Sequence, residues 1–255
     1  MGRIEMLAVS VTLPDDSLTS RPPIVFVHGA ANSALVWMFW QRELASQGWA
    51  SYAIDLRGHG RSDPIDLSRT TMHDYAADVR SLAIQLAQKP VIMGWSMGGL
   101  VAMMVAATSH AAACVALAPS LPARQVDASV VLRAGEFGAE EYGITSHDPA
   151  EQSEMPDLDS EERTVALASL GRESRWARDQ RKAGIVIESL PCPLLIVTGS
   201  ADNQWPDERY DGLWLAADRL KVEGASHWGL MLNRRALATV IPAVLRWLDA
   251  AIRVR

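Results

Sequence analysis

One serine in the chain stands in a pattern that can make it a nucleophile. Ser96 lies between Gly94 and Gly98, after the apolar run 90–93 and before the Ala- and Met-rich run 99–108. Glycines at these two positions let a strand and a helix approach closely, and the sharp turn between them exposes the serine hydroxyl. The N-terminal N–H groups of a helix over 99–108 would favour negative charge beside that hydroxyl. The same five residues also fit a glycine-rich turn with an incidental serine.

A serine nucleophile requires a base, and the base requires a third group that orients it. Of the six histidines, three lie in loops that come immediately after apolar, strand-like runs: His28, His59 and His227. Of these three, only His227 comes after Ser96 and after an aspartate, Asp202, that itself follows such a run. The order Ser96, Asp202, His227 is the nucleophile, acid and base order expected for this motif. Asp207 is the alternative acid, although it follows a proline and falls at the start of a predicted helix.

Apolar runs alternating with helical patterns would position these side chains. Continuous apolar runs are typical of strands buried on both faces of a parallel sheet. Strands are expected at 4–13, 24–27, 49–54, 90–93, 114–118, 194–198 and 219–223. Helices are expected at 33–47, 71–89, 99–108, 160–182, 207–217 and 234–252. Ser33 is the expected cap of its helix, and Thr71 with Asp74 has the spacing of a capping box.

This alternation predicts an α/β fold with a mostly parallel central sheet flanked by helices. Right-handed crossovers then bring the loops after the strands, and the polar residues in them, to one edge of the sheet. The pattern breaks over residues 121–190, which are mixed, acidic and rich in arginine. An insertion between two strands at the ligand-binding edge is typical of a lid. We therefore expect a core of residues 1–120 and 191–255, and a helical lid of residues 121–190.

Composition limits the classes of partner. The chain has 255 residues, 49% of them hydrophobic and 21% charged, values typical of a globular domain of ordinary size. Its net charge of −6 argues against nucleic acid and against an anionic membrane surface as partners, because both require clustered Lys and Arg. The expected partner is a small-molecule substrate that is neutral or apolar. The sequence makes no prediction of oligomeric state.

Targeting and metal-binding patterns are not recognisable in the sequence. The N-terminal stretch 1–14 lacks the apolar core and cleavage site of a signal peptide, and no apolar run reaches the length that spans a bilayer. Cys114 and Cys192 lie in different strand-like runs without metal-like or redox-like spacing. Free thiols in a reducing compartment are the default for such cysteines. These observations predict a cytoplasmic protein without a metal site.

Taken together, the motifs resemble those of the α/β-hydrolase superfamily. Five motifs in the family's order carry the resemblance: His28-Gly29, the D-x-R-G-x-G-x-S loop from Asp55 to Ser62, Gly94-Trp95-Ser96-Met97-Gly98-Gly99, Gly199 with Asp202, and Ser226-His227. The resemblance covers nearly the whole chain outside residues 121–190. It implies an oxyanion hole made by the backbone N–H groups of Ala30 and Met97, each donor being worth about 3 kcal/mol in acyl transfer. It also implies structural roles for His28, Arg57 and His59, and no cofactor.

The residues of the substrate pocket are less sharply predicted. Four tryptophans, three of them beside the motifs and one in the insertion, are the expected pocket residues: Trp37, Trp95, Trp176 and Trp228. Large aromatic side chains near a site often line it, but they equally often belong to the core.

The resemblance leaves several reactions open. A serine at the nucleophile position points to a serine hydrolase that acts on small, largely apolar carboxylic esters through an acyl-enzyme on Ser96. The alternatives are a hydrolase of C–C bonds in ring-cleavage products, a cofactor-free haloperoxidase and an acyltransferase. A C–C hydrolase would need an arginine near the nucleophile, for which the candidates are Arg124, Arg175 and Arg178. A non-enzymatic receptor with the same fold is disfavoured because it would not need the alignment of Ser96, Asp202 and His227.

Overall fold

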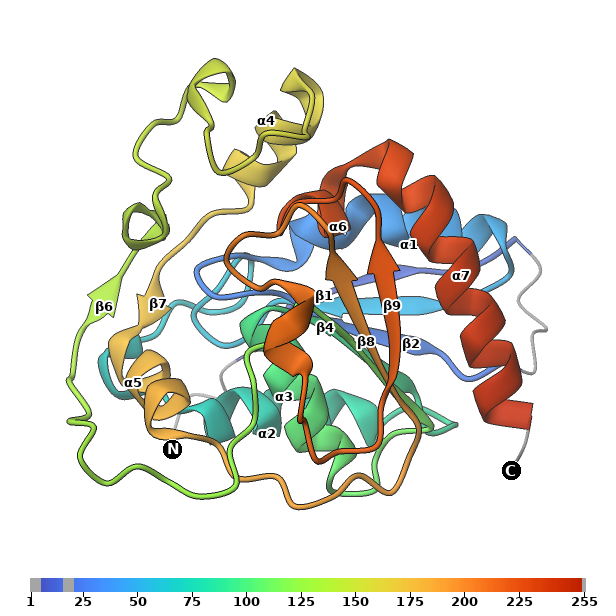
Figure 1. The fold of residues 1–255 in the computed structure, drawn as a ribbon, viewed down its shortest axis with the longest axis horizontal. Coiled ribbons are helices and arrows are strands. Elements are labelled where there is room, and N and C mark those ends of the chain that lie inside the picture. Colours follow the sequence, from blue (N-terminus) through green and yellow to red (C-terminus); the bar gives the residue numbers. More distant parts are fainter. Residues whose placement is uncertain (1–5, 16–20, 254–255) are drawn as a thin grey trace.

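A computed structural model describes residues 6–15 and 21–253, and it shows a seven-stranded sheet covered by helices (Figure 1). The strands run in the order β1-β3-β2-β4-β5-β8-β9. Their bounds are β1 Val9–Thr12, β2 Ile24–Val27, β3 Ser51–Ile54, β4 Val91–Trp95, β5 Ala113–Leu117, β8 Leu194–Gly199 and β9 Asp218–Val222. Strand β1 is antiparallel to β3 and every other pair is parallel. The predicted α/β fold with a mostly parallel sheet is confirmed; residues 4 and 5 of the expected first strand lie outside the described residues.

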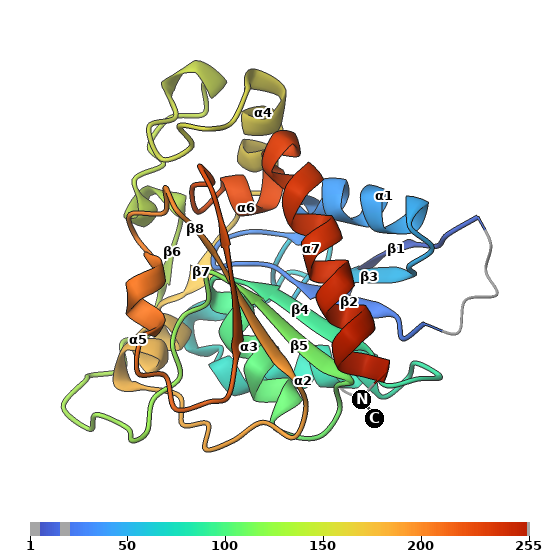
Figure 2. The same cartoon turned by 45° about the vertical axis from the view of Figure 1, so that its right-hand side comes forward.

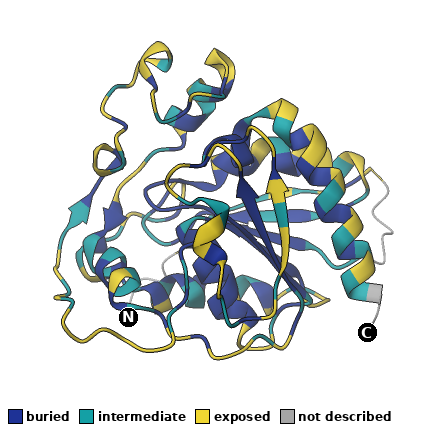
Figure 3. Cartoon of the chain, viewed as in Figure 1, coloured by how far each residue is buried: buried dark blue, intermediate teal, exposed yellow. Residues whose placement is uncertain are grey.

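Helices cover both faces of the sheet. Their bounds are α1 Met38–Ser46, α2 Met72–Ala83, α3 Met97–Ala106, α6 Gly229–Leu232 and α7 Arg234–Arg253. Figure 2 shows α2 and α3 on one face, and α1 and α7 on the other. Two separate clusters of buried apolar side chains correspond to these two layers. All four residues of β2 and all five residues of β4 are buried, as Figure 3 shows for the centre of the sheet.

The insertion, residues 121–190, lies between β5 and β8 and folds alongside the sheet (Figure 1). It contains β6 Glu136–Phe137, α4 Ser160–Ala168, β7 Glu173–Ser174 and α5 Arg175–Ala183. Its two ends run side by side, since Ala123 N donates to Ile185 O at 2.8 Å. Helix α5 packs against α2, and α4 packs against α6. The insertion therefore contacts the core through both of its helices.

Three of the expected helices are shorter than predicted or interrupted. Residues 160–182 do not form one helix, because Gly171 N donates to Ala31 O of the core and Glu173 pairs within the small sheet β6–β7. The expected helix 207–217 is only the 3-10 turn Asp207–Tyr210, which is followed by Gly212 with a φ of +74°. The helix expected at 71–89 ends at Ala83. Tertiary contacts and one left-handed glycine override the helical pattern of the sequence in the first two cases.

The two predicted helix caps have different outcomes. The capping box of Thr71 and Asp74 is present at the start of α2. The helix expected at 33–47 instead begins as the 3-10 turn Ala34–Trp37 and continues as α1. Ser33 takes the cap position there without a side-chain cap hydrogen bond. The carboxylate of Asp55 accepts the Ala34 N–H at 2.6 Å, so a residue from another loop supplies the acceptor.

Candidate active site

The turn that carries Ser96 is strained. Ser96 joins β4 to α3 with φ 56° and ψ −117°, a conformation rare for a residue with a side chain and costing about 1–3 kcal/mol. A Cβ atom on Gly94 would lie 2.0 Å from Gly98 O, and one on Gly98 would lie 2.3 Å from His28 O. Only glycines fit these two positions, because strand, helix and neighbouring loop approach so closely. The turn therefore has the geometry that the spacing of the two glycines predicts.

His227 and Asp202 form a hydrogen-bonded pair. The distance from His227 Nδ1 to Asp202 Oδ2 is 2.7 Å, and Asp202 Oδ1 accepts the N–H groups of Gln204 at 3.0 Å and Trp205 at 2.8 Å. Burial alone would raise the pKa of Asp202, but these hydrogen bonds and the nearby imidazole hold it below its ordinary value. Asp202 is thus an ionised acceptor for Nδ1–H. The bond fixes the tautomer in which Nε2 carries a lone pair.

Ser96 and His227 face a common cavity of about 60 Å³. The core contributes aromatic residues to its wall, and the insertion contributes residues of both polarities. The core tryptophans are Trp95, Trp205 and Trp228. The insertion residues are Ala139, Tyr142, Ile144, Leu170 and Arg181. Core and insertion together line this cavity, so a small reacting group in it would be partly screened from bulk water.

The loop after β2 forms another part of the cavity wall. Gly29 and Ala30 line the cavity, and Ala31 has a φ of +54°. His28 holds this loop: its Nδ1 donates to Gly29 O at 2.8 Å and its Nε2 accepts the Leu56 N–H at 3.2 Å. Burial, together with the neighbouring His59, lowers the pKa of His28 to about 4, so the ring is neutral and both nitrogens are occupied. His28 therefore shapes the loop and has no nitrogen for a substrate.

Two carboxylates of the insertion hold loops of the site. Glu173 Oε2 accepts the Ala31 N–H at 3.2 Å, in the loop that lines the cavity. Asp157 accepts the Ser226 N–H at 2.9 Å and the Ser226 hydroxyl at 2.5 Å, directly before His227. The insertion thus fixes backbone on two sides of Ser96.

Glu173 also belongs to a buried polar cluster with His59 and Tyr75. Tyr75 OH donates to Glu173 Oε1 at 2.6 Å, and His59 Nε2 lies 3.5 Å from Glu173 Oε2, an ion-pair distance. Burial alone would raise the pKa of Glu173, but the charges of His59 and then Arg181 lower it to about 2. Burial alone would lower the pKa of His59, but Glu173 raises it above its ordinary value. The two residues therefore form a charged pair.

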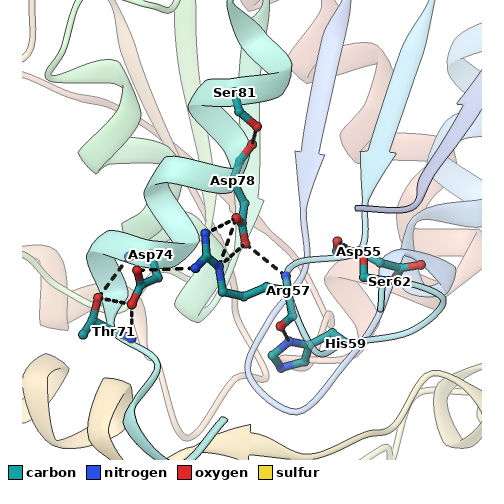
Figure 4. Close-up of polar contacts among 8 residues, drawn as sticks. All are labelled: Asp55, Arg57, His59, Ser62, Thr71, Asp74, Asp78 and Ser81. Atoms are coloured by element: carbon teal, nitrogen blue, oxygen red, sulfur yellow. Dashed lines mark hydrogen bonds and ion pairs between the residues drawn. The ribbon is translucent and has the colours of Figure 1, made fainter. Parts of the chain in front are cut away.

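The D-x-R-G-x-G-x-S loop makes structural contacts. Figure 4 shows the Arg57 side chain turned toward Asp74 and Asp78 of α2. Arg57 Nη2 lies 2.6 Å from Asp78 Oδ1, and Arg57 Nη1 lies 3.4 Å from Asp74 Oδ1. Ser62 Oγ donates to Asp55 O at 2.6 Å and closes the loop. These contacts fix the loop against β3 and α2, as the resemblance implies for Arg57.

Comparison with known proteins decides the family. The family model described as the alpha/beta hydrolase family matches residues 24–240. The chain belongs to the α/β-hydrolase family. It is 27% identical over 182 residues to the AB hydrolase superfamily protein YisY of Bacillus subtilis, covering 68% of this chain and 61% of YisY.

Two further comparisons describe a relative and a structure similar to this α/β hydrolase. It is 31% identical over 86 residues to the pimeloyl-[acyl-carrier protein] methyl ester esterase of Aliivibrio fischeri, which is 34% of this chain and 31% of that esterase. Its fold matches a thermophilic esterase from Thermogutta terrifontis with a TM-score of 0.67 at 20% identity, over 96% of this chain and 94% of the other. The sequence match thus spans about a third of the curated esterase, and the structural match shows the shared fold.

Only two of the four tryptophans predicted for the pocket of this hydrolase line the cavity. Trp95 and Trp228 do so, and their rings pack 4.9 Å apart. Trp37 is fully buried in the core and stacks on Phe26 at 4.3 Å. Trp176 lies on α5 beside the guanidinium of Arg69, 5.2 Å from its ring centroid. Trp37 therefore belongs to the apolar core, and Trp176 packs the insertion onto the core.

Several residues of the cavity wall carried no recognisable signal in the sequence. Tyr142, Leu170 and Arg181 come from an insertion whose helical pattern does not indicate which side chains line the cavity with Ser96.

Within residues 6–15 and 21–253 no cluster of three or more His, Cys, Asp or Glu could hold a metal ion. None of the helices found in those residues has the length and apolarity needed to cross a membrane.

Proposed function

We propose that this α/β hydrolase cleaves small carboxylic esters through an acyl-enzyme on Ser96. The single observation that supports it most is the His227–Asp202 hydrogen bond of 2.7 Å on the wall of a cavity that also holds the strained Ser96. A nucleophile, a base and an orienting carboxylate are the three groups that acyl transfer on serine requires. The A. fischeri relative is by name a methyl ester esterase, which is consistent with this reaction class.

The proposed reaction has two half-reactions. Ser96 Oγ attacks the ester carbonyl while His227 Nε2 takes the hydroxyl proton, and the C–O bond to the alcohol breaks as His227 returns that proton to the leaving oxygen. Water then attacks the acyl-enzyme, gives its proton to His227, and releases the carboxylic acid as Ser96 regains the proton. Asp202 keeps the imidazole in the reactive tautomer throughout.

Charge on the tetrahedral oxygen needs hydrogen-bond donors. We assign this role to the backbone N–H groups of Met97, the first residue of α3, and of Ala30. The Glu173 hydrogen bond to Ala31 supports this assignment, because it fixes the backbone that follows Ala30. Preorganised donors of this kind contribute about 3–4 kcal/mol each to transition-state stabilisation.

The insertion serves as a lid in this proposal. Residues 121–190 supply five residues of the cavity wall and would exclude water around the developing oxyanion.

Hydrolysis of a C–C bond is the second candidate, and it is supported by an arginine in the wall of the cavity. The three arginines predicted for that reaction are engaged elsewhere: Arg124 lies over Trp214, and Arg175 and Arg178 pair with Glu141. A different arginine of the insertion, Arg181, lines the cavity together with Tyr142.

A turnover screen separates the two candidates. Purified protein would be assayed on p-nitrophenyl esters of increasing acyl length and on a ring-cleavage dienoate, with the Ser96→Ala variant as control. The proposal predicts hydrolysis of the short esters and at least about a hundredfold loss in Ser96→Ala. Turnover of the dienoate alone would replace ester hydrolysis with C–C hydrolysis.

A further inference from the structure

We propose that Arg181 binds a carboxylate of the substrate, so that the ester cleaved at Ser96 is a half-ester of a dicarboxylic acid. This inference rests on the proposed function, because it places the anion in the cavity that Ser96 and His227 share. It replaces the neutral or apolar substrate expected from composition with a small monoanion. The net charge of −6 does not oppose this, because the local field of a partly buried guanidinium dominates at contact distance.

The guanidinium of Arg181 is poorly satisfied. Its Nε is buried and has no hydrogen-bond partner among the described residues. Its Nη1 lies 3.4 Å from the hydroxyl of Ser120 and its Nη2 lies 3.3 Å from the hydroxyl of Tyr142. Both contacts are long for hydrogen bonds, and both partners are uncharged.

Four other arginines of the insertion pair with carboxylates, whereas Arg124 lies over the ring of Trp214 and Arg163 donates to the backbone oxygens of Met155 and Pro149. Arg133 pairs with Asp179 at 2.6 Å, and Arg175 and Arg178 pair with Glu141. Arg172 lies 3.7 Å from both Glu136 and Glu140. Arg181 has no carboxylate within 4.0 Å in the part of the chain that the structure describes. A partly buried cation without a paired carboxylate is suited to receive one from the substrate.

Glu173 does not fill that role. Its Oε1 accepts Tyr75 OH at 2.6 Å and Ser174 N at 2.7 Å, and its Oε2 accepts Ala31 N at 3.2 Å and pairs with His59 at 3.5 Å. Both carboxylate oxygens are already occupied by the core. Arg181 lowers the pKa of Glu173 through its charge without contacting it.

Arg181 is close to the nucleophile. Ser120, whose hydroxyl it contacts, donates its backbone N–H to Ser96 O at 3.0 Å. The cavity that Arg181 lines has a second residue with an unpartnered buried donor, Trp95 with its Nε1 atom. A guanidinium also matches the two oxygens of a carboxylate better than any neutral group.

The test compares matched substrates that differ only in the distal carboxylate. Monomethyl succinate, glutarate and adipate would be assayed against the methyl esters of the monocarboxylic acids with the same number of carbons, for the parent, Arg181→Gln and Arg181→Lys. The parent should prefer the half-ester of the best length by at least about tenfold in kcat/KM, and Arg181→Gln should remove that preference by lowering kcat/KM much more for the half-esters than for the neutral esters. Arg181→Lys should restore part of the half-ester preference, because lysine restores the positive charge but not the planar group that binds both carboxylate oxygens.

Arg178→Gln is the matched control, since Arg178 lies one turn earlier on α5 and pairs with Glu141. It should keep the half-ester preference. Equal turnover of half-esters and neutral esters by the parent would overturn the proposal. So would an equal loss on both substrate types in Arg181→Gln, which would mean that Arg181 is structural.

A binding measurement keeps this inference separate from the proposed reaction. The affinity of Ser96→Ala for glutarate and adipate would be measured by calorimetry, with and without Arg181→Gln. Binding that Arg181→Gln weakens at least about tenfold supports the subsite even if no ester is hydrolysed. Absence of binding in Ser96→Ala, or binding that Arg181→Gln leaves unchanged, contradicts it.

Discussion

Two histidine–carboxylate pairs lie near the same loops, and only one of them faces the cavity. The His227–Asp202 pair has its ring 13% exposed and its Nδ1–Oδ2 distance is 2.7 Å. The His59–Glu173 pair is fully buried, with a separation of 3.5 Å. The difference lies in what remains of each ring. His227 uses Nδ1 for Asp202 and keeps Nε2 at the cavity. His59 uses Nδ1 for Arg57 O, and its buried Nε2 lies 3.5 Å from Glu173 Oε2, at ion-pair distance but without a hydrogen bond.

The comparison teaches that residue type alone does not distinguish the pair that we propose to be catalytic from a structural one. Asp202 orients a ring toward a cavity, and Glu173 joins the insertion to the core through Tyr75 and Ala31. A histidine that acts as a base must keep one ring nitrogen free and accessible to the substrate. A histidine–carboxylate pair that only joins two parts of the protein is buried and makes its contacts within the protein. Substitutions in the two pairs should therefore change different quantities.

The largest expected effect is on turnover in variants of the His227–Asp202 pair, which faces the cavity. His227→Ala and Asp202→Asn should each lower kcat/KM for a p-nitrophenyl ester by at least about a hundredfold with little change in melting temperature. The physical reason is the loss of the base or of its tautomer. Asp207→Asn is the matched control, because Asp207 binds Thr198 and Arg219 instead. Nearly full activity in Asp202→Asn would exclude Asp202 as the orienting acid.

The next effect is on stability in the buried pair. Glu173→Gln should lower the free energy of unfolding by about 3–5 kcal/mol, because it leaves the buried imidazolium of His59 without its counter-charge. Turnover by the folded fraction should fall much less than in His227→Ala. Urea titration followed by tryptophan fluorescence measures the first quantity. An unchanged unfolding midpoint in Glu173→Gln would contradict the structural role of this pair.

The buried pair also predicts a pH dependence of stability. The pKa of Glu173 falls from an ordinary 4.5 to about 2 on folding, so the unfolded chain takes up a proton first and stability is lost as pH falls from about 4.5 toward 2. The pKa of His59 is raised on folding, so its contribution is present below the ordinary value of 6.5 and is lost as pH rises through the raised pKa. The stability difference between the parent and Glu173→Gln should be greatest between these limits. A difference independent of pH would refute the charged pair.

A smaller effect distinguishes a tryptophan that lines the cavity, Trp228, from one that packs the insertion onto the core, Trp176. Trp228→Ala should change the ranking of esters of different acyl length by about 1–3 kcal/mol in transition-state binding, because Trp228 lines the cavity. Trp176→Ala should lower the melting temperature and reduce all substrates in proportion, because Trp176 contacts Arg69 of the core. Three p-nitrophenyl esters measured on both variants suffice. A changed ranking of the three esters in Trp176→Ala would support the prediction from the sequence that Trp176 is a substrate-pocket residue.

The sequence predicted the sheet and the loops after its strands because both depend on local patterns. The apolar runs identify the strands, parallel pairing brings their carboxyl ends together, and so Ser96, Asp202 and His227 fall at one edge. The spacing of two glycines also predicted the strained turn, since the close approach at Gly94 and Gly98 leaves no room for a Cβ atom.

The contacts of the insertion could not be predicted in this way. Glu173 and Ala31 are 142 positions apart, and Asp157 and Ser226 are 69 apart. Nothing in the local pattern at either end indicates such a partner. The helical periodicity of 160–182 was misleading for the same reason, since the buried contacts of Glu173 interrupt the helix.

Covalent labelling of the nucleophile tests the central claim most directly. The parent protein would be incubated with a p-nitrophenyl phosphonate and digested, and the modified peptide would be identified by mass spectrometry, with His59→Ala and His227→Ala run in parallel. The account predicts one adduct, on Ser96, formed at least about a hundredfold more slowly in His227→Ala and at nearly the parent rate in folded His59→Ala. An adduct on another residue, or hydrolysis of esters that continues without any adduct, would contradict it.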